Sequence, residues 1–594
     1  MSYRAPVQDM LFAMQHLAQL DALAQLPGLS DANSDTAAAV LDECARFAEG
    51  VLAPLNHSAD QTPSRFDAGQ VITSSGFQAA YAQLRAGGWQ GLQHPAEFGG
   101  QGLPKTIGAA CSEMFSSANL SFSLVSLLTD GATEALLTAG SAELQNRYLP
   151  QLISGQWAGT MNLTEPQAGS DLALIRSRAE PQTDGSYRVF GSKIFITYGE
   201  QDLSENIIHL VLARTPDAPA GIKGISLFVV PKFLPQADGS LGARNDVHCV
   251  GIEHKLGIKA SPTCTLQYGD HGGAIGYLVG EENRGLEYMF IMMNAARYSV
   301  GVQGIGLAER AYQHAVAFAR ERVQSRPVDG SSKAAVAIIE HPDVRRMLMT
   351  MRALTQGCRA LAAFAAGQHD LAQHHPDAAL RNQAQTLYEF LVPLVKGYST
   401  EMVQEVAQLG VQVHGGMGFI EETGAAQYLR DAKILAIYEG TTAIQANDLI
   451  GRKTLRDQGA FARSLAAQIE KTVQQLQATG DVGAARIAGH VHSACTAFTQ
   501  SVGFLCHTAA AAPNAAYAGS VPFLMLAGNA FAGWQMAQSW LAAHRLGKEQ
   551  AAFALQKKIT CQFYAEHILP RCQAAEQAIS QGAGSCLALR AEDF

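Results

Sequence analysis

A change of periodicity in the middle of the chain constrains the fold more than any other feature. Between about residues 160 and 283, short β-prone runs alternate with Gly, Pro and Asp turn signals. The clearest of these runs are SYRVFGSKIFITYG, NIIHLVLAR, GISLFVVPKF and SPTCTLQYG. On both sides of this region, apolar residues recur at helical spacing. The sequence therefore predicts a compact β-domain set between helical regions.

This order predicts an α+β fold, mainly α, with several domains in 594 residues. The apolar stretch Val521–Ala543 is interrupted by Asn529 and Gln535, so we interpret it as a buried helix and not a membrane span. The expected domains are a helical N-terminal extension (1–45), an N-terminal helical domain (46–158), a middle β-barrel-like domain (159–283), a C-terminal four-helix bundle (284–452) and an additional helical C-terminal domain (453–594).

Charge and cysteine content exclude several classes of protein. The formal net charge is −9 without a long basic run, which argues against a nucleic-acid or anionic-membrane surface. The ten cysteines form no CxxC pair, so we expect neither a metal site nor a disulfide framework. The N-terminal residues match neither a secretory signal nor an Arg-rich transit peptide. We therefore expect reduced thiols and a cytoplasmic location.

Three stretches carry candidate binding groups. MNLTEPQAGSDL offers the Thr164 and Ser170 hydroxyls, which together with backbone amides have the groups to bind flavin carbonyls or a phosphate. GSKIFITYGE is an aromatic-rich strand that would flank a planar ring. In ARERVQSR, Arg322 and Gln324 have the groups to clamp a pyrophosphate. Taken singly, each has an ordinary structural alternative, namely a turn, a buried strand and an exposed helix end.

A fourth stretch combines VQVHGGMGF with ILAIYEGTTAIQ. Paired glycines, Gly415 and Gly416, let the backbone approach a ligand closely. Glu439 follows an apolar run, and apolar surroundings raise a carboxyl pKa toward the working range of a general base. The alternative is a helix-capping glutamate. Thr441 and Thr442 are equally candidates for the N-cap of the following helix, where they could also place a phosphate.

The order and spacing of these motifs resemble the acyl-CoA dehydrogenase family over roughly residues 50–452. LTEPQAGSD, GSKIFIT, LGIKASPT, HGGMGF and YEGTT all occur in the family's order. The resemblance implies FAD between the β-domain and the helical bundle, held partly by a second subunit. It also implies a helical–β–helical architecture, as the periodicity predicts.

Carried over by position, the resemblance assigns roles to individual residues. Many members have Trp where this chain has Phe195, so we expect altered shielding of the flavin ring and not loss of binding. The implied flavin residues are Leu163, Thr164, Ser170, Phe195 and Thr197; the pyrophosphate residues are Arg322 and Gln324; the adenosine residues of the neighbouring subunit are Gln412, Gly415 and Gly416; further phosphate contacts are Thr441 and Gln445; and the substrate residues are Ser170, Arg297, Tyr438 and Gly440.

Glu439 matches the usual catalytic base of the family. A minority of members carry the base just before the position of Arg297, where this chain has Ala296. The implied reaction removes the α-proton with Glu439 while the β-carbon passes hydride to the flavin. A flavin ribityl hydroxyl and the Glu439 backbone N–H would stabilise the developing enolate charge. The product that the resemblance implies is the trans-2-enoyl-CoA of fatty acid β-oxidation.

Extensions at both ends resemble the larger subgroup, which includes the very-long-chain and 3-methylthiopropanoyl-CoA dehydrogenases. In large members the C-terminal helices take the place of a second subunit pair, so we expect a homodimer. The implied electron acceptor is electron-transfer flavoprotein. Two alternatives stay open: an acyl-CoA oxidase that uses oxygen, and a non-catalytic relative that binds FAD and DNA. The length of the acyl chain is not readable from the sequence.

Overall fold

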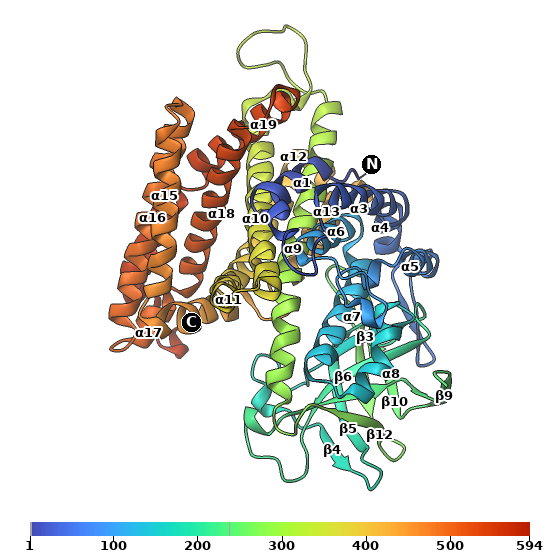
Figure 1. The fold of residues 1–594 in the computed structure, drawn as a ribbon. Coiled ribbons are helices and arrows are strands. Elements are labelled where there is room, and N and C mark those ends of the chain that lie inside the picture. The colour runs from blue at the N-terminus through green and yellow to red at the C-terminus, as the bar shows by residue number, and fades with distance from the viewer. Residues whose placement is uncertain (1–2, 237) are drawn as a thin grey trace. The chain divides into compact units, whose positions relative to one another are not determined.

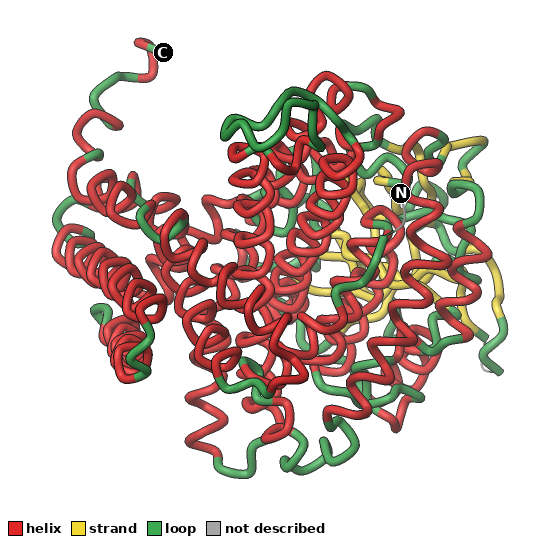
Figure 2. Tube along the Cα trace, turned by 90° about the horizontal axis from the view of Figure 1, so that it is seen from above, coloured by secondary structure: helices red, strands yellow, loops and turns green. Residues whose placement is uncertain are grey.

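The protein divides into two compact units in a computed structural model that describes residues 3–236 and 238–594. Unit 1 contains Met1–Arg46, Pro104–Ser117 and Arg297–Phe594, and is almost entirely helical. Unit 2 contains Phe47–Leu103 and Ala118–Ala296 and holds the β-strands. Figure 1 follows the chain through both units by colour, and the strands are yellow in Figure 2. The predicted α+β, mainly helical class is confirmed.

The main sheet of unit 2 has eight strands in the order β10-β11-β5-β12-β7-β6-β3, and β4 pairs with β5. The β3–β6 pair is parallel and the other pairs are antiparallel. The strands are β3 (Trp157–Asn162), β4 (Arg178–Pro181), β5 (Tyr187–Thr197), β6 (Asn206–Ala213), β7 (Ser226–Pro231), β10 (Val247–Ile252), β11 (Thr263–Tyr268) and β12 (Ala274–Val279).

Burial explains why these runs form strands. Every residue of β6 and β7 is buried, as expected for continuous apolar runs in the middle of a sheet. Strand β5 instead has mixed burial along its eleven residues. All four runs predicted as strands are strands here.

Helices also pack in unit 2, and two of them have clear caps. The α7 helix begins after Asn119, whose side chain accepts the Phe122 N–H, and α8 begins after Ser141, whose hydroxyl accepts the Leu144 N–H. By length and hydropathy α7 could span a membrane, but 72% of its most apolar window is buried inside the protein. We therefore interpret it as a core helix. The helices are α4 (Ala53–Gln61), α5 (Phe77–Ala86), α7 (Leu120–Ala139) and α8 (Ala142–Ile153).

Two short hairpins of unit 2 were not predicted. β1 (Arg65–Asp67) pairs with β2 (Gln70–Ile72), within the segment expected to be helical, and β8 (Phe233–Pro235) pairs with β9 (Leu241–Arg244). Strands of three or four largely exposed residues leave no alternating apolar signal in a sequence. The Ala68–Gly69 turn, with both residues at positive φ, is the local feature that closes the first hairpin.

Long helices build unit 1, and α9 enters it from unit 2 at Arg297. Its helices are α1 (Val7–His16), α2 (Leu20–Leu23), α3 (Ser34–Phe47), α6 (Lys105–Ala118), α9 (Gly285–Glu321), α10 (Pro342–His374), α11 (Ala378–Pro393), α12 (Ser399–His414), α13 (Ala425–Leu435), α14 (Thr442–Asp448), α15 (Ala460–Ala478), α16 (Val482–Thr508), α17 (Pro513–Ala518), α18 (Ser520–His544), α19 (Ala551–His567), α20 (Arg571–Gln581) and α21 (Ala583–Cys586).

The C-terminal helices form a layered extension around α18. Helices α16, α19 and α20 all pack against it, and α15 packs against α16 (Figure 1). Most residues of α18 are buried, including the polar Asn529 and Gln535. The prediction that Val521–Ala543 is a buried helix is therefore confirmed. The buried Tyr398 hydroxyl donates to Asn529 Oδ1 at 2.8 Å, which ties the extension to the rest of unit 1.

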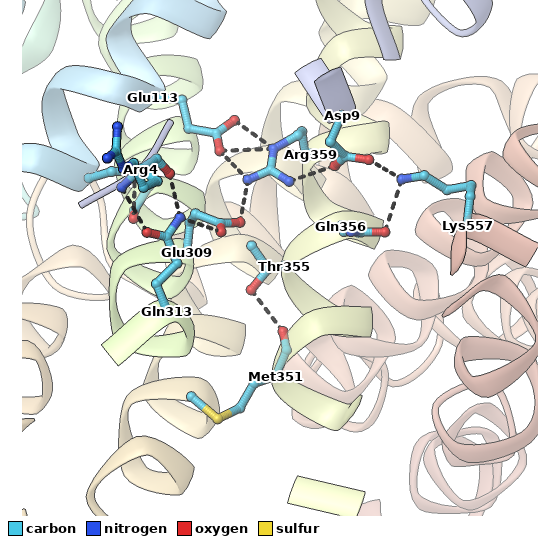
Figure 3. A network of polar contacts seen from close by, with 12 residues as sticks. Arg4, Asp9, Glu113, Glu309, Gln313, Met351, Thr355, Gln356, Arg359 and Lys557 are labelled. Atoms are coloured by element: carbon cyan, nitrogen blue, oxygen red, sulfur yellow. Dashed lines mark hydrogen bonds and ion pairs between the residues drawn. The ribbon is translucent and has the colours of Figure 1, made fainter. Parts of the chain in front are cut away.

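A buried ion network joins helices of unit 1 that are far apart in sequence (Figure 3). The Arg359 guanidinium on α10 donates to Glu113 at 2.6 Å, to Glu309 at 2.7 Å and to Asp9 at 2.7 Å. Lys557 on α19 forms a further ion pair with Asp9. Burial opposes ionisation of Asp9, but Lys557 and Arg359 outweigh it and lower its pKa to about 2. The network thereby connects α1, α6, α9, α10 and α19.

Replacing Arg359 by Met should destabilise unit 1 strongly. The change would leave Glu113 and Glu309 buried without their cation, and breaking a buried pair in this way costs about 3–5 kcal/mol. We expect a clear fall in the apparent unfolding temperature in calorimetry, together with faster proteolysis near α1. Arg346→Met is the matched control, because the Arg346–Asp343 pair on the same helix is exposed and should contribute little. Equal effects of the two variants would contradict the assignment.

Candidate active site

Glu439 lies in the turn that joins α13 to α14, and its backbone is in the left-handed region. Its φ is +54°, and Gly440 follows with φ +88°. A non-glycine residue in this region is uncommon and indicates a conformation imposed by its surroundings. Among the described residues, no backbone or side-chain group accepts a hydrogen bond from the Glu439 N–H. The turn therefore presents both a carboxylate and a backbone donor.

Two cations face the Glu439 carboxylate. Burial raises the pKa of Glu439, while Arg297 and Lys396 act in the opposite direction. Arg297 lies on α9 and is 4% exposed, and burial lowers its pKa against the attraction of Asp448 and Glu439. The raised carboxyl pKa agrees with the expectation from the apolar run before Glu439. A raised pKa makes a carboxylate a stronger proton acceptor, which suits a general base.

The residues flanking Glu439 are held by side chains from other helices. The Tyr438 hydroxyl donates to Gln303 Oε1 on α9 at 2.5 Å. Thr441 is the N-cap residue of α14, but its side chain makes no capping hydrogen bond. Thr442 is the first residue of that helix, and its hydroxyl donates to Glu401. Of the two threonines considered for the cap, Thr441 therefore keeps its hydroxyl available.

Gln445 is fully buried beside the turn. Its amide nitrogen donates to the carbonyl oxygens of Glu439 and Gly440 at 3.4 and 3.3 Å. The amide oxygen of the same side chain is buried without a hydrogen-bond partner among the described residues. A buried acceptor of this kind requires a donor. The Gln445 side chain therefore has the capacity to accept one further hydrogen bond.

Arg322 and Gln324 follow the end of α9. Arg322 Nη2 and Gln324 Oε1 are 3.5 Å apart, so the two side chains point to the same place. Their backbone is fixed, because Ile338 N–H donates to the Arg322 carbonyl and Gln324 N–H donates to the Val336 carbonyl. Both side chains are exposed. The pair thus offers a guanidinium and an amide on a rigid backbone, a set suited to phosphate oxygens.

Gln412, Gly415 and Gly416 lie at the end of α12. Gly415 has φ +59°, and a Cβ added at either glycine would meet no atom within 4 Å, so this surface is open. Met417 and Phe419 follow, and Phe419 is 86% exposed. An exposed large apolar side chain beside open glycines is typical of a surface that binds another molecule.

In unit 2, a buried ion pair fixes the segment that contains Leu163, Thr164 and Ser170. Lys193 Nζ on β5 lies 2.8 Å from Glu165 Oε1, and it also donates to the Leu163 carbonyl at 3.1 Å. Burial disfavours the Glu165 carboxylate, but Lys193 and backbone donors outweigh this and lower its pKa to about 2. Leu163 and Thr164 therefore lie along β5, while Ser170 is exposed at the end of the turn.

Phe195 lies at a β-bulge of β5. The pairing with β11 shifts between Cys264 and Leu266, where one β11 residue faces Ile194 and Phe195. Phe195 has φ +61° and is 58% exposed, whereas Thr197 pairs in register with Thr263. Bulges re-aim side chains and are frequent beside active sites. The bulge explains why a large aromatic residue of a central strand faces outward.

The structure therefore gathers the predicted residues into sets within each unit. In unit 1, Arg297, Tyr438, Gly440, Thr441 and Gln445 surround or flank Glu439, and Arg322 with Gln324 forms a second set. In unit 2, Leu163, Thr164, Phe195 and Thr197 share one segment of β5 and its neighbouring turn. No described contact tests the functional roles given to these residues, which stay predictions.

Sequence reasoning missed three polar residues next to Glu439. They are Gln303, Glu401 and Lys396, and Lys396 donates to the Gly440 carbonyl at 2.6 Å. Of these, Lys396 left a signal, because it is the single charged residue in the apolar run LVPLVKGY. Lysine is almost never fully buried unless it is paired.

Comparisons with known proteins agree with this architecture. Acyl-CoA dehydrogenase models match residues 34–156 (N-terminal domain), 160–271 (middle domain) and 283–454 (C-terminal domain), and an acetyl-CoA dehydrogenase C-terminal-like model matches 465–590. The chain is 55% identical to 3-methylmercaptopropionyl-CoA dehydrogenase of Ruegeria pomeroyi over 99% of both chains. It is 35% identical to the broad-specificity linear acyl-CoA dehydrogenase FadE5 of Mycobacterium tuberculosis over 97% of both.

A solved structure shares the fold across nearly the whole chain. It is an acyl-CoA dehydrogenase from Bacillus anthracis complexed with FAD, with a TM-score of 0.73 and 22% identity. The match covers 94% of this chain and 90% of that one. The similarity thus includes the C-terminal extension as well as the central domains.

Replacing Glu165 by Gln should loosen the segment that carries Leu163 and Thr164. Lys193 would then be buried without its counter-charge, at a cost of about 3–5 kcal/mol near neutral pH. The loss of folding stability should become smaller as pH rises, because Lys193 can then lose its proton. Burial has already lowered the pKa of Lys193 to about 8. Thermal unfolding at several pH values and hydrogen exchange of residues 163–172 would measure both effects.

The double variant Glu165→Gln with Lys193→Met is the control for this experiment. It removes the uncompensated charge and should recover part of the lost stability. A single variant as stable as the wild type at every pH would contradict a role for the ion pair.

Proposed function

The chain belongs to the acyl-CoA dehydrogenase family, and we propose that it oxidises an acyl-CoA thioester to the trans-2-enoyl-CoA, with Glu439 as the base. One observation carries the assignment of the base: Glu439 presents a carboxylate and a backbone N–H without an intramolecular acceptor from one left-handed turn. Ala296, at the other position that family members use, has no group that accepts a proton.

The chemistry of these two groups is complementary. The carboxylate removes the proton from the α-carbon, and the N–H donates to the thioester carbonyl as negative charge develops on its oxygen. An N–H that needs no reorganisation stabilises such charge most effectively. Arg297 and Lys396 keep the carboxylate ionisable although burial raises its pKa. Substrate contacts are proposed for Ser170, Arg297, Tyr438 and Gly440.

We infer that the cofactor is FAD, which the related B. anthracis enzyme binds. The residues present fit this group, since Gln445 has a buried amide oxygen without a partner and the Gly415–Gly416 surface is open. When bound, FAD supplies the acceptor for the hydride of the β-carbon. The proposed ligands are Leu163, Thr164, Ser170, Phe195, Thr197, Arg322, Gln324, Thr441 and Gln445, with Gln412, Gly415 and Gly416 from a partner subunit.

The proposed electron acceptor is electron-transfer flavoprotein, and the proposed assembly is a homodimer. The exposed apolar residues Met417, Phe419 and Ile420 support the dimer, because they lie beside the glycines expected to reach a neighbouring cofactor. All ten cysteines are free thiols, which supports a reducing, cytoplasmic location. The charge of −9 disfavours the DNA-binding alternative.

Glu439→Gln should abolish reduction of the bound flavin by substrate. The amide cannot accept the α-proton, and loss of a general base lowers rates about 10²–10⁴-fold. Anaerobic bleaching of the flavin absorbance with a panel of acyl-CoAs measures the effect. The panel should begin with 3-methylmercaptopropionyl-CoA, the substrate in the name of the 55% identical relative. Retained bleaching would contradict the assignment, and peroxide release that matches substrate oxidation would identify an oxidase instead.

Phe419→Ser should weaken both the dimer and the binding of FAD. An 86% exposed phenylalanine gains stabilisation only when another surface covers it. Sedimentation velocity and the ratio of flavin to protein after gel filtration measure the two properties. Val328→Ser, an 82% exposed apolar residue in the loop after α9, is the control and should change neither. A stable wild-type monomer that retains FAD would contradict the dimer.

A further inference from the structure

Lys396 is a fully buried lysine in an irregular part of unit 1. It lies in the π-helical turn Leu394–Tyr398, which connects α11 to α12. Pro393 precedes this turn and has no N–H for a regular helical hydrogen bond. Single π-helical turns inside helices occur frequently at functional sites. A turn of this kind sets the direction of the Lys396 side chain differently from a continuous helix.

The ammonium group reaches the turn of Glu439. Lys396 Nζ donates to the carbonyl oxygen of Gly440 at 2.6 Å, and no described carboxylate forms an ion pair with it. The two other buried lysines of the described chain, Lys193 and Lys557, both pair with carboxylates. Lys396 differs from these two lysines because its acceptor among the described residues is a backbone carbonyl and not a carboxylate.

That carbonyl belongs to the peptide unit that follows the base. Because Glu439 and Gly440 both have positive φ, their conformation depends on contacts outside the turn. Gln445 donates to the same carbonyl at 3.3 Å, which is a longer contact than that of Lys396. A charge-assisted hydrogen bond of 2.6 Å is the stronger of the two. Lys396 thus makes the principal contact that holds the Gly440 carbonyl.

We propose that Lys396 is a positioning residue for the reaction: its ammonium group fixes the Glu439–Gly440 turn, so that the carboxylate and backbone N–H of Glu439 face the substrate together. The inference rests on the proposed function of Glu439. Lys396 touches neither substrate nor cofactor in this scheme and acts through Glu439 and its turn.

The charge of Lys396 adds a second consequence. Burial and Arg297 lower the pKa of Lys396, Glu439 and Glu401 raise it, and the balance is about 8, so the ammonium is charged near neutral pH. The groups that face Glu439 are Arg297 from α9 and Lys396, with Tyr438 next to it in the turn. Arg297 in turn faces Asp448 and Arg452. Removing the Lys396 charge removes one attraction for the carboxylate, so the pKa of Glu439 rises.

The test compares Lys396→Met with wild type by a readout that does not need hydride transfer. An acyl-CoA in which sulfur replaces the β-carbon has no hydride to give, but Glu439 can remove its α-hydrogen and return deuterium from D₂O. Proton NMR then follows loss of the α-hydrogen signal. We expect exchange to slow about 10–100-fold, as for a base displaced by about 1 Å. The acid limb of the pH profile of the exchange rate should move to higher pH by roughly 1 unit.

Controls separate positioning from general destabilisation. Lys557→Met removes another buried lysine of unit 1 and should lower thermal stability without moving the pH profile. Lys396→Arg keeps the charge and donors and should restore part of the exchange rate. If Lys396→Met does not fold, Lys396→Gln tests the loss of charge alone through the shift of the acid limb.

The outcomes distinguish this inference from the proposed function. A folded Lys396→Met protein that exchanges at the wild-type rate with an unmoved acid limb overturns the inference, while the base assignment stands. Wild-type exchange that Glu439→Gln leaves unchanged overturns the base assignment itself. Unaltered flavin content in Lys396→Met, with slowed exchange, supports the inference.

Discussion

The Arg359 guanidinium is the interaction on which the arrangement of unit 1 depends. This single cation on α10 forms ion pairs with carboxylates on α1, α6 and α9 (Figure 3). Asp9, the carboxylate on α1, also pairs with Lys557 on α19. Each partner is buried, so none can exchange its contact for water without a large desolvation cost. The ion pairs fix the position of α9 against α10, and α9 also carries Arg297 and Gln303 of the candidate site.

Several cationic side chains are buried in this protein, and they differ in the group that accepts their hydrogen bonds. The type of acceptor indicates what each cation does in the structure. Lys193 pairs with Glu165 and orders a turn beside β5, whereas Lys396 donates to the carbonyl after Glu439. A carboxylate partner neutralises the buried lysine, but a carbonyl partner leaves its charge available to neighbouring groups. Near Glu439, that charge opposes the effect of burial on the carboxyl pKa.

Among the described residues, nine non-glycine residues have positive φ, and two of them are residues that the resemblance marks as functional. Glu439 and Phe195 are both non-glycine residues with positive φ, one in a turn and the other in a β-bulge. Such conformations persist only where surrounding contacts determine them. The Lys396 and Gln445 hydrogen bonds supply those contacts for the turn after Glu439. The pairing of β5 with β11 supplies them for Phe195.

The sequence by itself determined the class of fold, the four main strand runs and the identity of Glu439 as the candidate base. Those features depend on periodicity and on motifs, which are local along the chain. Only the tertiary structure revealed the Arg359 network, the Phe195 bulge and the contact between Lys396 and Gly440. Each joins residues that are distant in sequence or depends on strand register, and a single sequence carries no record of either. Lys396 shows the limit well, since its apolar run predicts burial but not its acceptor 44 residues later.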